Sequence, residues 1–311
     1  MEQAISPAVR LVEVEKAFAV KDSAPTIALT GIDLEIGQQE FISLIGPSGC
    51  GKSTLLRVIG DLVTPSAGSV EVNSKPAHQA RLDRDYGMVF QAPVLFDWRT
   101  VEANVRLPLE VTGFPKGQRD ALVQEKLELV ELGSFAKHYP HQLSGGMQQR
   151  VAIARALALQ PSILLMDEPF GALDEMTRER LNAELLDIWS ETRTTVVFVT
   201  HSIPEAVFLS ARVVVMSPRP GRIAETIDID LPYPRDETTR EADRYYELVT
   251  EVREALRGRP DDTIDLAARA RSDSWVAPLS SRSCTKWRAR RGMSSGRSRS
   301  GGTRKLTTAR R

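Results

Sequence analysis

Residues 46–54 carry the pattern that most limits what this chain can fold into. The segment reads Gly-Pro-Ser-Gly-Cys-Gly-Lys-Ser-Thr, in which two glycines flank four residues and are followed by Lys52 and Ser53. It lies between the apolar run 41–45 and a stretch with the apolar spacing of a helix. In such a loop the backbone N–H groups point at phosphate oxygens, with the partial positive charge of a helix N-terminus behind them. The segment therefore predicts a strand, a phosphate-binding loop and a helix at the start of an α/β core.

Each position of this loop has a chemical reason. Glycines keep side chains away from the phosphates, Lys52 reaches the β- and γ-phosphates, and the hydroxyl of Ser53 is a ligand for Mg²⁺. Cys50 is interpreted as a small, tolerated side chain rather than a redox group. The residues expected to bind the nucleotide here are Gly46, Pro47, Ser48, Gly49, Cys50, Gly51, Lys52, Ser53 and Thr54.

A pair of acids ends a second apolar run. Residues 163–166 read Ile-Leu-Leu-Met and are followed by Asp167 and Glu168. At the carboxyl edge of a parallel sheet, Asp167 would hold Mg²⁺ and Glu168 would act as the general base that polarises the attacking water. Two acids after a strand usually form only a solvated turn. Beside a phosphate-binding loop the catalytic interpretation is favoured.

Between these two elements lies the run Leu-Ser-Gly-Gly-Met-Gln-Gln-Arg at residues 143–150. It resembles the signature motif of the ATP-binding cassette (ABC) ATPases, and the resemblance extends over residues 8–235. A P-loop kinase, the weakest alternative, gives no explanation for this run. The resemblance implies an enzyme that binds ATP with Mg²⁺ and hydrolyses it.

The other motifs of that family are present in the expected order, and the resemblance implies their roles. Gln91 matches the glutamine that senses Mg²⁺ and the γ-phosphate, and His201 matches the histidine that contacts the γ-phosphate. Asp174 matches the D-loop, and Phe18 falls where the family places an aromatic ring against adenine. The expected catalytic residues are Lys52, Gln91, Glu168 and His201, and the expected Mg²⁺ ligands are Ser53, Gln91 and Asp167.

The signature run also has a physical interpretation of its own. Ser144 precedes two glycines at a helix start, so a hydroxyl and free N–H groups lie at the positive end of a helix dipole. One nucleotide cannot easily use this loop and the loop at 46–54 of the same chain. The resemblance implies that two subunits pack head to tail and that Ser144, Gly145 and Gly146 bind the partner's ATP. A helix cap without a ligand is the alternative.

Apolar periodicity and turn residues divide the chain into short elements. Strands are predicted at 9–14, 32–36, 41–45, 69–72, 87–90, 163–166, 196–200, 213–216 and 222–229. Helices are predicted at 52–59, 101–109, 119–132, 145–159, 175–191 and 237–257. The resemblance implies a P-loop NTPase (RecA-like) core with an antiparallel β-subdomain and an inserted α-helical subdomain.

The expected divisions of the chain follow from that architecture. They are the N-terminal part of the ATPase core with the antiparallel strands and the phosphate loop (1–94), the helical subdomain with the signature motif (95–160), the C-terminal part of the core (161–235), a C-terminal helix (236–270) and a basic, disordered tail (271–311).

A narrower resemblance lies outside the shared motifs. Segments 98–101, 166–174, 213–223 and 230–235 look like those of the ATPases of nitrate/sulfonate/taurine-type importers. This implies a subunit that couples ATP binding and hydrolysis in a dimer to uptake of a small solute through a separate permease. Relatives that carry a pyrimidine precursor of thiamine leave that substrate as an alternative, because the ATPase itself does not contact the solute.

The same resemblance implies the partners and the location. They are a second copy of the chain, an integral-membrane permease and, indirectly, a solute-binding protein, with the chain peripheral to the cytoplasmic face of the membrane. Helical residues 95–142 would press on the permease, with Phe96 and Trp98 either in that contact or in core packing. A non-transport ABC ATPase of DNA repair or translation is less favoured, since the 115 residues from Lys52 to Asp167 leave room only for a compact helical subdomain.

The charge distribution separates the tail from the rest. The net charge is zero, yet residues 271–311 hold twelve Lys or Arg and a single acid. The remaining 270 residues are therefore acidic, so no binding of nucleic acid is expected of them. The tail is interpreted as an unpartnered disordered end or the product of a reading-frame change, ahead of an arm for nucleic acid or anionic lipid. The two cysteines, Cys50 and Cys284, form no disulfide framework, and no apolar run reaches the ~18 residues of a membrane span.

Overall fold

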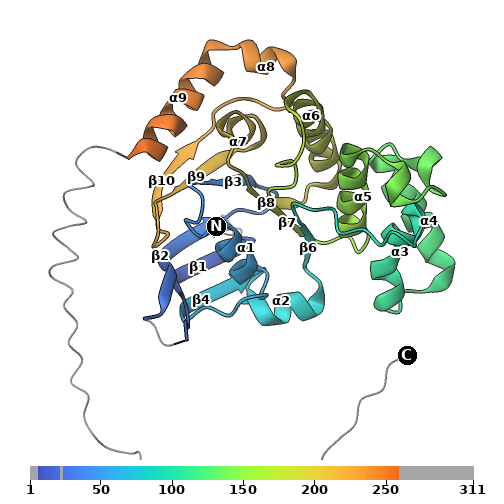
Figure 1. Ribbon diagram of the computed structural model, residues 1–311, viewed down its shortest axis with the longest axis horizontal. Helices are drawn as coiled ribbons and strands as arrows, with labels where there is room; N and C mark the ends of the chain where they lie inside the picture. The colour runs from blue at the N-terminus through green and yellow to red at the C-terminus, as the bar shows by residue number, and fades with distance from the viewer. Residues whose placement is uncertain (1–5, 22–23, 259–311) are drawn as a thin grey trace, which may run out of the picture. The chain divides into compact units, whose positions relative to one another are not determined.

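The computed structural model of the chain describes residues 6–21 and 24–258 (Figure 1). The predicted basic tail, 271–311, and the last part of the predicted segment 236–270 lie outside these residues. Within them, no helix combines the length and the apolar character that crossing a membrane requires.

A six-stranded sheet forms the centre of the described chain. Its strands, in spatial order, are β10 (Ile223–Asp228), β9 (Arg212–Met216), β3 (Phe41–Ile45), β8 (Thr195–Val199), β7 (Ile163–Asp167) and β6 (Tyr86–Val89). The pairs from β9 to β6 are parallel, and only β10 joins the edge in the antiparallel sense. All the carboxyl ends of the parallel strands therefore meet at one edge, where ligands bind in open α/β sheets.

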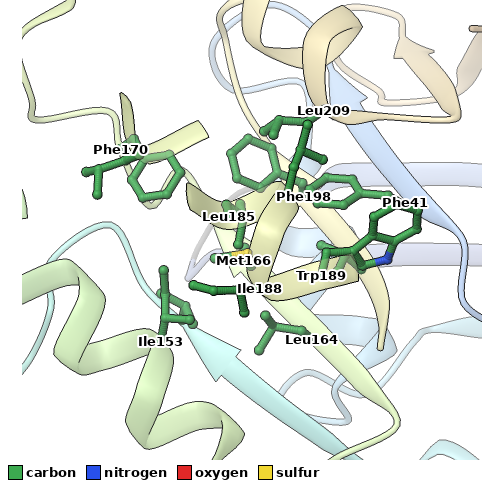
Figure 2. Close-up of a cluster of buried hydrophobic side chains, with 14 of the residues drawn as sticks. Phe41, Ile153, Leu164, Met166, Phe170, Leu185, Ile188, Trp189, Phe198 and Leu209 are labelled. Carbon is green, nitrogen blue, oxygen red and sulfur yellow. The ribbon is translucent and has the colours of Figure 1, made fainter. Parts of the chain in front are cut away.

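The parallel strands are continuously apolar because both faces of the sheet are covered. Along β3, Phe41 and Ile45 belong to one buried cluster, while Ile42 and Leu44 belong to another on the opposite face. Figure 2 shows the first cluster, in which the ring of Phe41 lies 5.9 Å, centroid to centroid, from those of both Trp189 and Phe198. The edge at which the parallel strands end therefore belongs to a sheet that is packed firmly on both faces.

A second sheet supplies the predicted antiparallel part of the fold. Its strands, in spatial order, are β2 (Thr26–Ile36), β1 (Val9–Phe18), β4 (Ala67–Val72) and β5 (Lys75–Pro76). Its inward side chains share a buried cluster with β3, β7 and β8 of the central sheet. This packing brings the end of β1, and with it Phe18, toward the loop that follows β3.

The helices cover the central sheet and extend beyond one end of it (Figure 1). They are α1 (Lys52–Ile59), α2 (Ala77–Asp83), α3 (Val101–Val111), α4 (Lys116–Leu129), α5 (Gly145–Leu157), α6 (Glu175–Thr192), α7 (Ile203–Leu209), α8 (Glu237–Glu241) and α9 (Asp243–Arg257). Helix α3 packs on α4 and α5, so the segment between β6 and β7 forms a helical layer. Short 3₁₀ turns, Gly133–Phe135 and Pro140–Gln142, connect α4 to α5.

Every predicted strand and helix has a counterpart, but several details of the prediction were wrong. The predicted helix 237–257 is two helices, because Ala242 is extended, with φ −68° and ψ 137°. The predicted helix 119–132 begins earlier, at Lys116 after Pro115, and ends at Leu129. Three short elements, β5, α2 and α7, were not predicted at all, since each has seven residues or fewer and shows little periodicity.

Candidate functional site

The loop between β3 and α1 has the backbone geometry that its glycines were expected to allow. Gly49 and Gly51 have φ angles of +76° and +107°, in the region that glycine enters without steric cost. A Cβ on Gly46 would stand 2.7 Å from the Sγ of Cys50, and one on Gly51 would stand 2.7 Å from a methyl of Leu29. The loop is therefore held closely against the sheets, with its backbone turned toward an adjoining cavity.

That cavity has a volume of about 260 Å³. Eight of the predicted residues line it, namely Phe18, Ser48, Gly49, Gly51, Lys52, Ser53, Thr54 and Glu168. Thr26, Ala28 and Arg219 also line it, and the sequence did not indicate them. Gly46, Pro47 and Cys50 are not among the lining residues, and the side chain of Cys50 is buried beneath the loop.

Lys52 lies at the base of this loop, only 6% exposed. Its ammonium donates hydrogen bonds to the carbonyl oxygens of Gly46, at 2.8 Å, and Pro47, at 3.3 Å. A phosphate oxygen is a stronger acceptor for an ammonium than a neutral carbonyl is. Lys52 is thus already held beside the position where a phosphate would enter.

Ser53 and Asp167 bring two oxygen atoms together from different elements. The Ser53 hydroxyl, in the first turn of α1, donates to Oδ1 of Asp167 at the end of β7 over 2.6 Å. The other carboxylate oxygen of Asp167 lies 3.7 Å from the guanidinium of Arg57. In nucleotide sites Mg²⁺ takes one or two protein oxygens and completes its shell with phosphate oxygens and water. This donor pair has the chemistry that such an ion requires.

The ends of β6, β7 and β8 bring Gln91, Glu168 and His201 close together. The Nδ1 atom of His201 lies 3.5 Å from Oε2 of Glu168. A Cβ on Gly171 would stand 3.4 Å from Nε2 of Gln91 and 3.6 Å from that same Oε2. Glu168 adopts φ +48°, a backbone conformation that costs a non-glycine residue about 1–3 kcal/mol and that is enriched at functional sites.

The signature residues do not reach the cavity of their own chain. Ser144 caps α5, since its Oγ accepts a hydrogen bond from the N–H of Met147 over 3.3 Å. A Cβ on Gly146 would stand 3.2 Å from the methyl of Thr177, and one on Gly145 would stand 3.2 Å from a methyl of Leu173. None of residues 144–146 is among those that line the cavity in the described part of the chain.

Asp174 likewise serves as a helix cap in this chain. Its Oδ1 atom accepts the N–H of Thr177 over 3.0 Å at the start of α6. This hydrogen bond holds the pKa of the Asp174 carboxyl below its ordinary value. The predicted D-loop thus lies against the signature glycines, through Leu173 and Thr177, and away from the lining of the cavity.

Two side chains of α5 that the sequence did not single out hold the segment around Gln91. Gln149, 1% exposed, donates from Nε2 to the carbonyl of Phe90 over 3.1 Å. Arg155 donates to the carbonyls of Pro93, at 2.8 Å, and Val94, at 2.7 Å. Burial lowers the pKa of Arg155. The partners are backbone atoms about sixty residues away, so no sequence pattern marks them.

We expect Arg155→Ala to impair both stability and turnover. Two charge-assisted hydrogen bonds, each worth about 1.5–3 kcal/mol, are lost, so the free energy of unfolding should fall by about 3–6 kcal/mol. Because Gln91 lies inside the released segment, kcat per folded molecule should also fall several-fold. Urea unfolding and phosphate release measure the two effects, with the exposed Arg253→Ala on α9 as control. An unchanged kcat would contradict a positioning role.

A buried carboxylate, that of Glu205, holds the segment that follows β8. The hydroxyl of Thr200 donates to Glu205, and the N–H of Ser202 donates to the same hydroxyl over 3.0 Å. Ser202 in turn caps α7, which carries Glu205. Burial raises the pKa of the Glu205 carboxyl. His201, between Thr200 and Ser202, is therefore fixed on both sides while its own ring stays exposed.

Trp98 lies on the surface next to this site, against the half-buried ring of Phe96. Trp98 is 74% exposed and its ring centroid is 5.0 Å from that of Phe96. The neighbouring Val94 is 60% exposed. The buried amide of Asn104 fixes the loop through the carbonyls of Phe96, at 3.1 Å, and Thr100, at 3.0 Å. For Trp98, the structure excludes the core-packing alternative.

A larger cavity, of about 800 Å³, lies between α4, α5 and α6 and contains none of the predicted site residues. Its acidic lining residues are Glu125, Glu128, Glu131, Glu184, Asp187 and Glu191. Only Lys126 and Arg150 oppose them. A phosphate group would be repelled there, so the smaller cavity at the sheet edge is the candidate nucleotide site.

Comparisons with known proteins agree with this geometry. Residues 29–171 match the family model described as ABC transporter. An uncharacterised ABC transporter ATP-binding protein of Methanocaldococcus jannaschii is 51% identical over 72% of this chain and 84% of its own length. The aliphatic sulfonates import ATP-binding protein of Bacillus subtilis is 46% identical over 72% of this chain and 86% of its own length.

Two further similarities bear on substrate and assembly. The bicarbonate transport ATP-binding protein of Synechococcus elongatus is 48% identical over 71% of this chain, which matches only 34% of that longer protein. A solved ATP-binding cassette, dimeric and in a post-hydrolysis state with ADP and phosphate, is 36% identical with a TM-score of 0.63. It matches 72% of this chain and the whole of its own.

Proposed function

This chain belongs to the family of ABC transporter ATP-binding proteins, and on that premise we propose that it is the ATP-hydrolysing subunit of an importer for small anionic solutes. The observation that carries the proposal is the meeting of three groups at one sheet edge. They are the phosphate loop, the Ser53–Asp167 oxygen pair and the Glu168–His201 pair. Together they provide for binding, charge neutralisation and proton transfer in attack by water on a phosphate.

Different residues of the cavity bind different parts of the nucleotide. Lys52 and the loop N–H groups bind the β- and γ-phosphates, and Phe18 lies against the base. Ser53, Asp167 and Gln91 would hold Mg²⁺, which neutralises charge on the phosphates when bound. Glu168 accepts the proton of the attacking water.

The second half of the site comes from another copy of the chain. Ser144, Gly145 and Gly146 present a hydroxyl and helix N–H groups away from their own cavity, so they are free to bind the partner's γ-phosphate. The dimeric relative with ADP and phosphate supports this arrangement. ATP binding would close a symmetric dimer, and hydrolysis would reopen it.

The exposed side chains of Val94 and Trp98, with the half-buried Phe96 between them, mark the face toward the permease. Val94, Phe96 and Trp98 follow Gln91 directly, and their loop is fixed by Arg155 and Asn104. Movement of Gln91 on hydrolysis would therefore be passed to this face. We place the chain on the cytoplasmic side of the membrane, with a solute-binding protein delivering the cargo on the other side.

For the cargo we propose sulfonates, with bicarbonate as the competing candidate. The support is the names of two relatives, an aliphatic sulfonates import protein at 46% identity and a bicarbonate transport protein at 48% identity. Uptake of labelled aliphatic sulfonates, nitrate and bicarbonate by cells with and without this gene tests the proposal. Loss of sulfonate uptake supports it, and loss of bicarbonate uptake alone reassigns the cargo.

We expect Trp98→Ala to weaken the association with the permease by more than tenfold. A buried tryptophan at the centre of an interface is commonly worth 2 kcal/mol or more. Co-purification of the two proteins from detergent-solubilised membranes measures the effect. Leu82→Ala, at an exposed position on α2, is the matched control. Retention of the permease at the wild-type level by Trp98→Ala would place the contact elsewhere.

A further inference from the structure

The loop between β9 and β10, residues 217–222, is fixed against both β2 and the phosphate loop. The N–H of Gly221 donates to the carbonyl of Ala28 over 3.0 Å, and the N–H of Thr30 donates to the carbonyl of Gly221 over 3.1 Å. A Cβ on Gly221 would overlap the carbonyl oxygen of Cys50. No larger residue can replace this glycine without separating the two loops. The tip of the β9–β10 loop is therefore held at a set position beside the cavity.

Arg219 is the residue at that tip. Its Nε atom lies 3.3 Å from the carbonyl oxygen of Gly49, to which it donates a hydrogen bond. Its terminal Nη2 atom lies 3.6 Å from the place where a Cβ on Gly49 would stand. The side chain is exposed and lines the cavity together with Phe18 and Lys52. Within the described residues, Arg219 forms no ion pair with a carboxylate.

The charges around the cavity leave this guanidinium without a strong partner. The basic residues that line the cavity are Lys52 and Arg219, and the acidic one is Glu168. The ammonium of Lys52 lies buried under the loop, whereas Arg219 reaches Gly49 from the side of the β9–β10 loop. A planar guanidinium with several N–H donors suits phosphate oxygens better than a single neutral carbonyl.

We propose that Arg219 is a nucleotide-binding residue that contacts the α- and β-phosphates of the bound nucleotide. This inference rests on the proposed function, since it assigns one more ligand to the same site. Lys52 binds the end of the triphosphate farthest from the nucleoside, and Phe18 contacts the base. Arg219, which lines the cavity with both, serves the phosphates nearest the nucleoside. It therefore gives affinity for di- and triphosphates over the uncharged nucleoside.

Binding of ADP and of adenosine to Arg219→Ala, by titration calorimetry without hydrolysis, tests the proposal. We expect the Kd for ADP to rise about tenfold or more, as for loss of one charge-assisted hydrogen bond, and the Kd for adenosine to change by less than about twofold. Arg219→Lys should fall between, because it keeps the charge and loses the planar fork. The wild-type affinity for ADP should also fall more steeply with salt than that of Arg219→Ala.

Phe18→Ala is the matched control, because it should weaken ADP and adenosine to similar extents. The exposed Arg219 side chain makes one hydrogen bond to the fold, so the unfolding temperature without nucleotide should stay at the wild-type value, which the same samples report. Equal ADP affinity of Arg219→Ala and wild type overturns this inference alone. A wild-type chain that binds no ADP overturns the proposed function and this inference with it.

Discussion

Glu168→Gln should reduce ATP turnover by about two to four orders of magnitude while ATP binding remains close to that of the wild type. General-base catalysis contributes a factor of that size, and an amide cannot take the proton of water at neutral pH. Glutamine has the same shape as glutamate and can adopt the φ of +48° found at this position as readily. The change therefore removes the base and leaves the phosphate loop and the Ser53–Asp167 pair in place.

The measurement pairs phosphate release with binding of ATP. Because unhydrolysed ATP keeps the dimer closed, the variant should also elute as a stable dimer when ATP is present and as the wild type does when it is absent. Glu191→Gln, an exposed acid at the far end of α6, controls for the change of charge. Turnover by Glu168→Gln within threefold of the wild type would show that another group takes the proton.

The parallel sheet and the edge that carries the site follow from features that are local in the sequence, whereas the order of the strands does not. Phe41–Ile45 is a buried run followed by the phosphate loop, and Ile163–Asp167 is a buried run that ends in an acid, so both could be predicted to end at the carboxyl edge of a parallel sheet. The break at Ala242 could not, since alanine favours helix. Just after the break, a tertiary contact holds the second helix, because the hydroxyl of Tyr245 donates to the carbonyl of Pro204 over 3.0 Å.

The candidate site likewise contains residues that the sequence could indicate and residues that it could not. Lys52, Glu168 and His201 belong to motifs that the chain shares with the ABC ATPases, and that resemblance implies their roles. Gln149 and Arg155 act on backbone carbonyls of a distant segment, and such partners have no sequence pattern. Arg219 lies in a segment that the sequence links only to one branch of the family, and its position over Gly49 depends on how two loops pack.

The signature residues are expected to bind the ATP of the partner chain, and changes at Ser144 test this. Ser144→Asp should abolish hydrolysis without loosening α5, since aspartate caps a helix as well as serine does. Its carboxylate would repel a γ-phosphate placed against the helix N-terminus. Ser144→Asn, which caps α5 equally without the charge, should retain much more activity. A fall in the free energy of unfolding of Ser144→Asp would indicate instead that its cap had failed.

Mixing this variant with Lys52→Ala separates action within one chain from action between two chains. In a symmetric dimer with two shared sites, a mixed pair has one site with both changes and one site with neither. Random pairing of equal amounts makes about half the dimers mixed, so activity should return to about a quarter of the wild-type value if the two sites act independently. Each variant alone should stay inactive. If Ser144 served the cavity of its own chain, every site in the mixture would carry one of the two changes, and no activity would return.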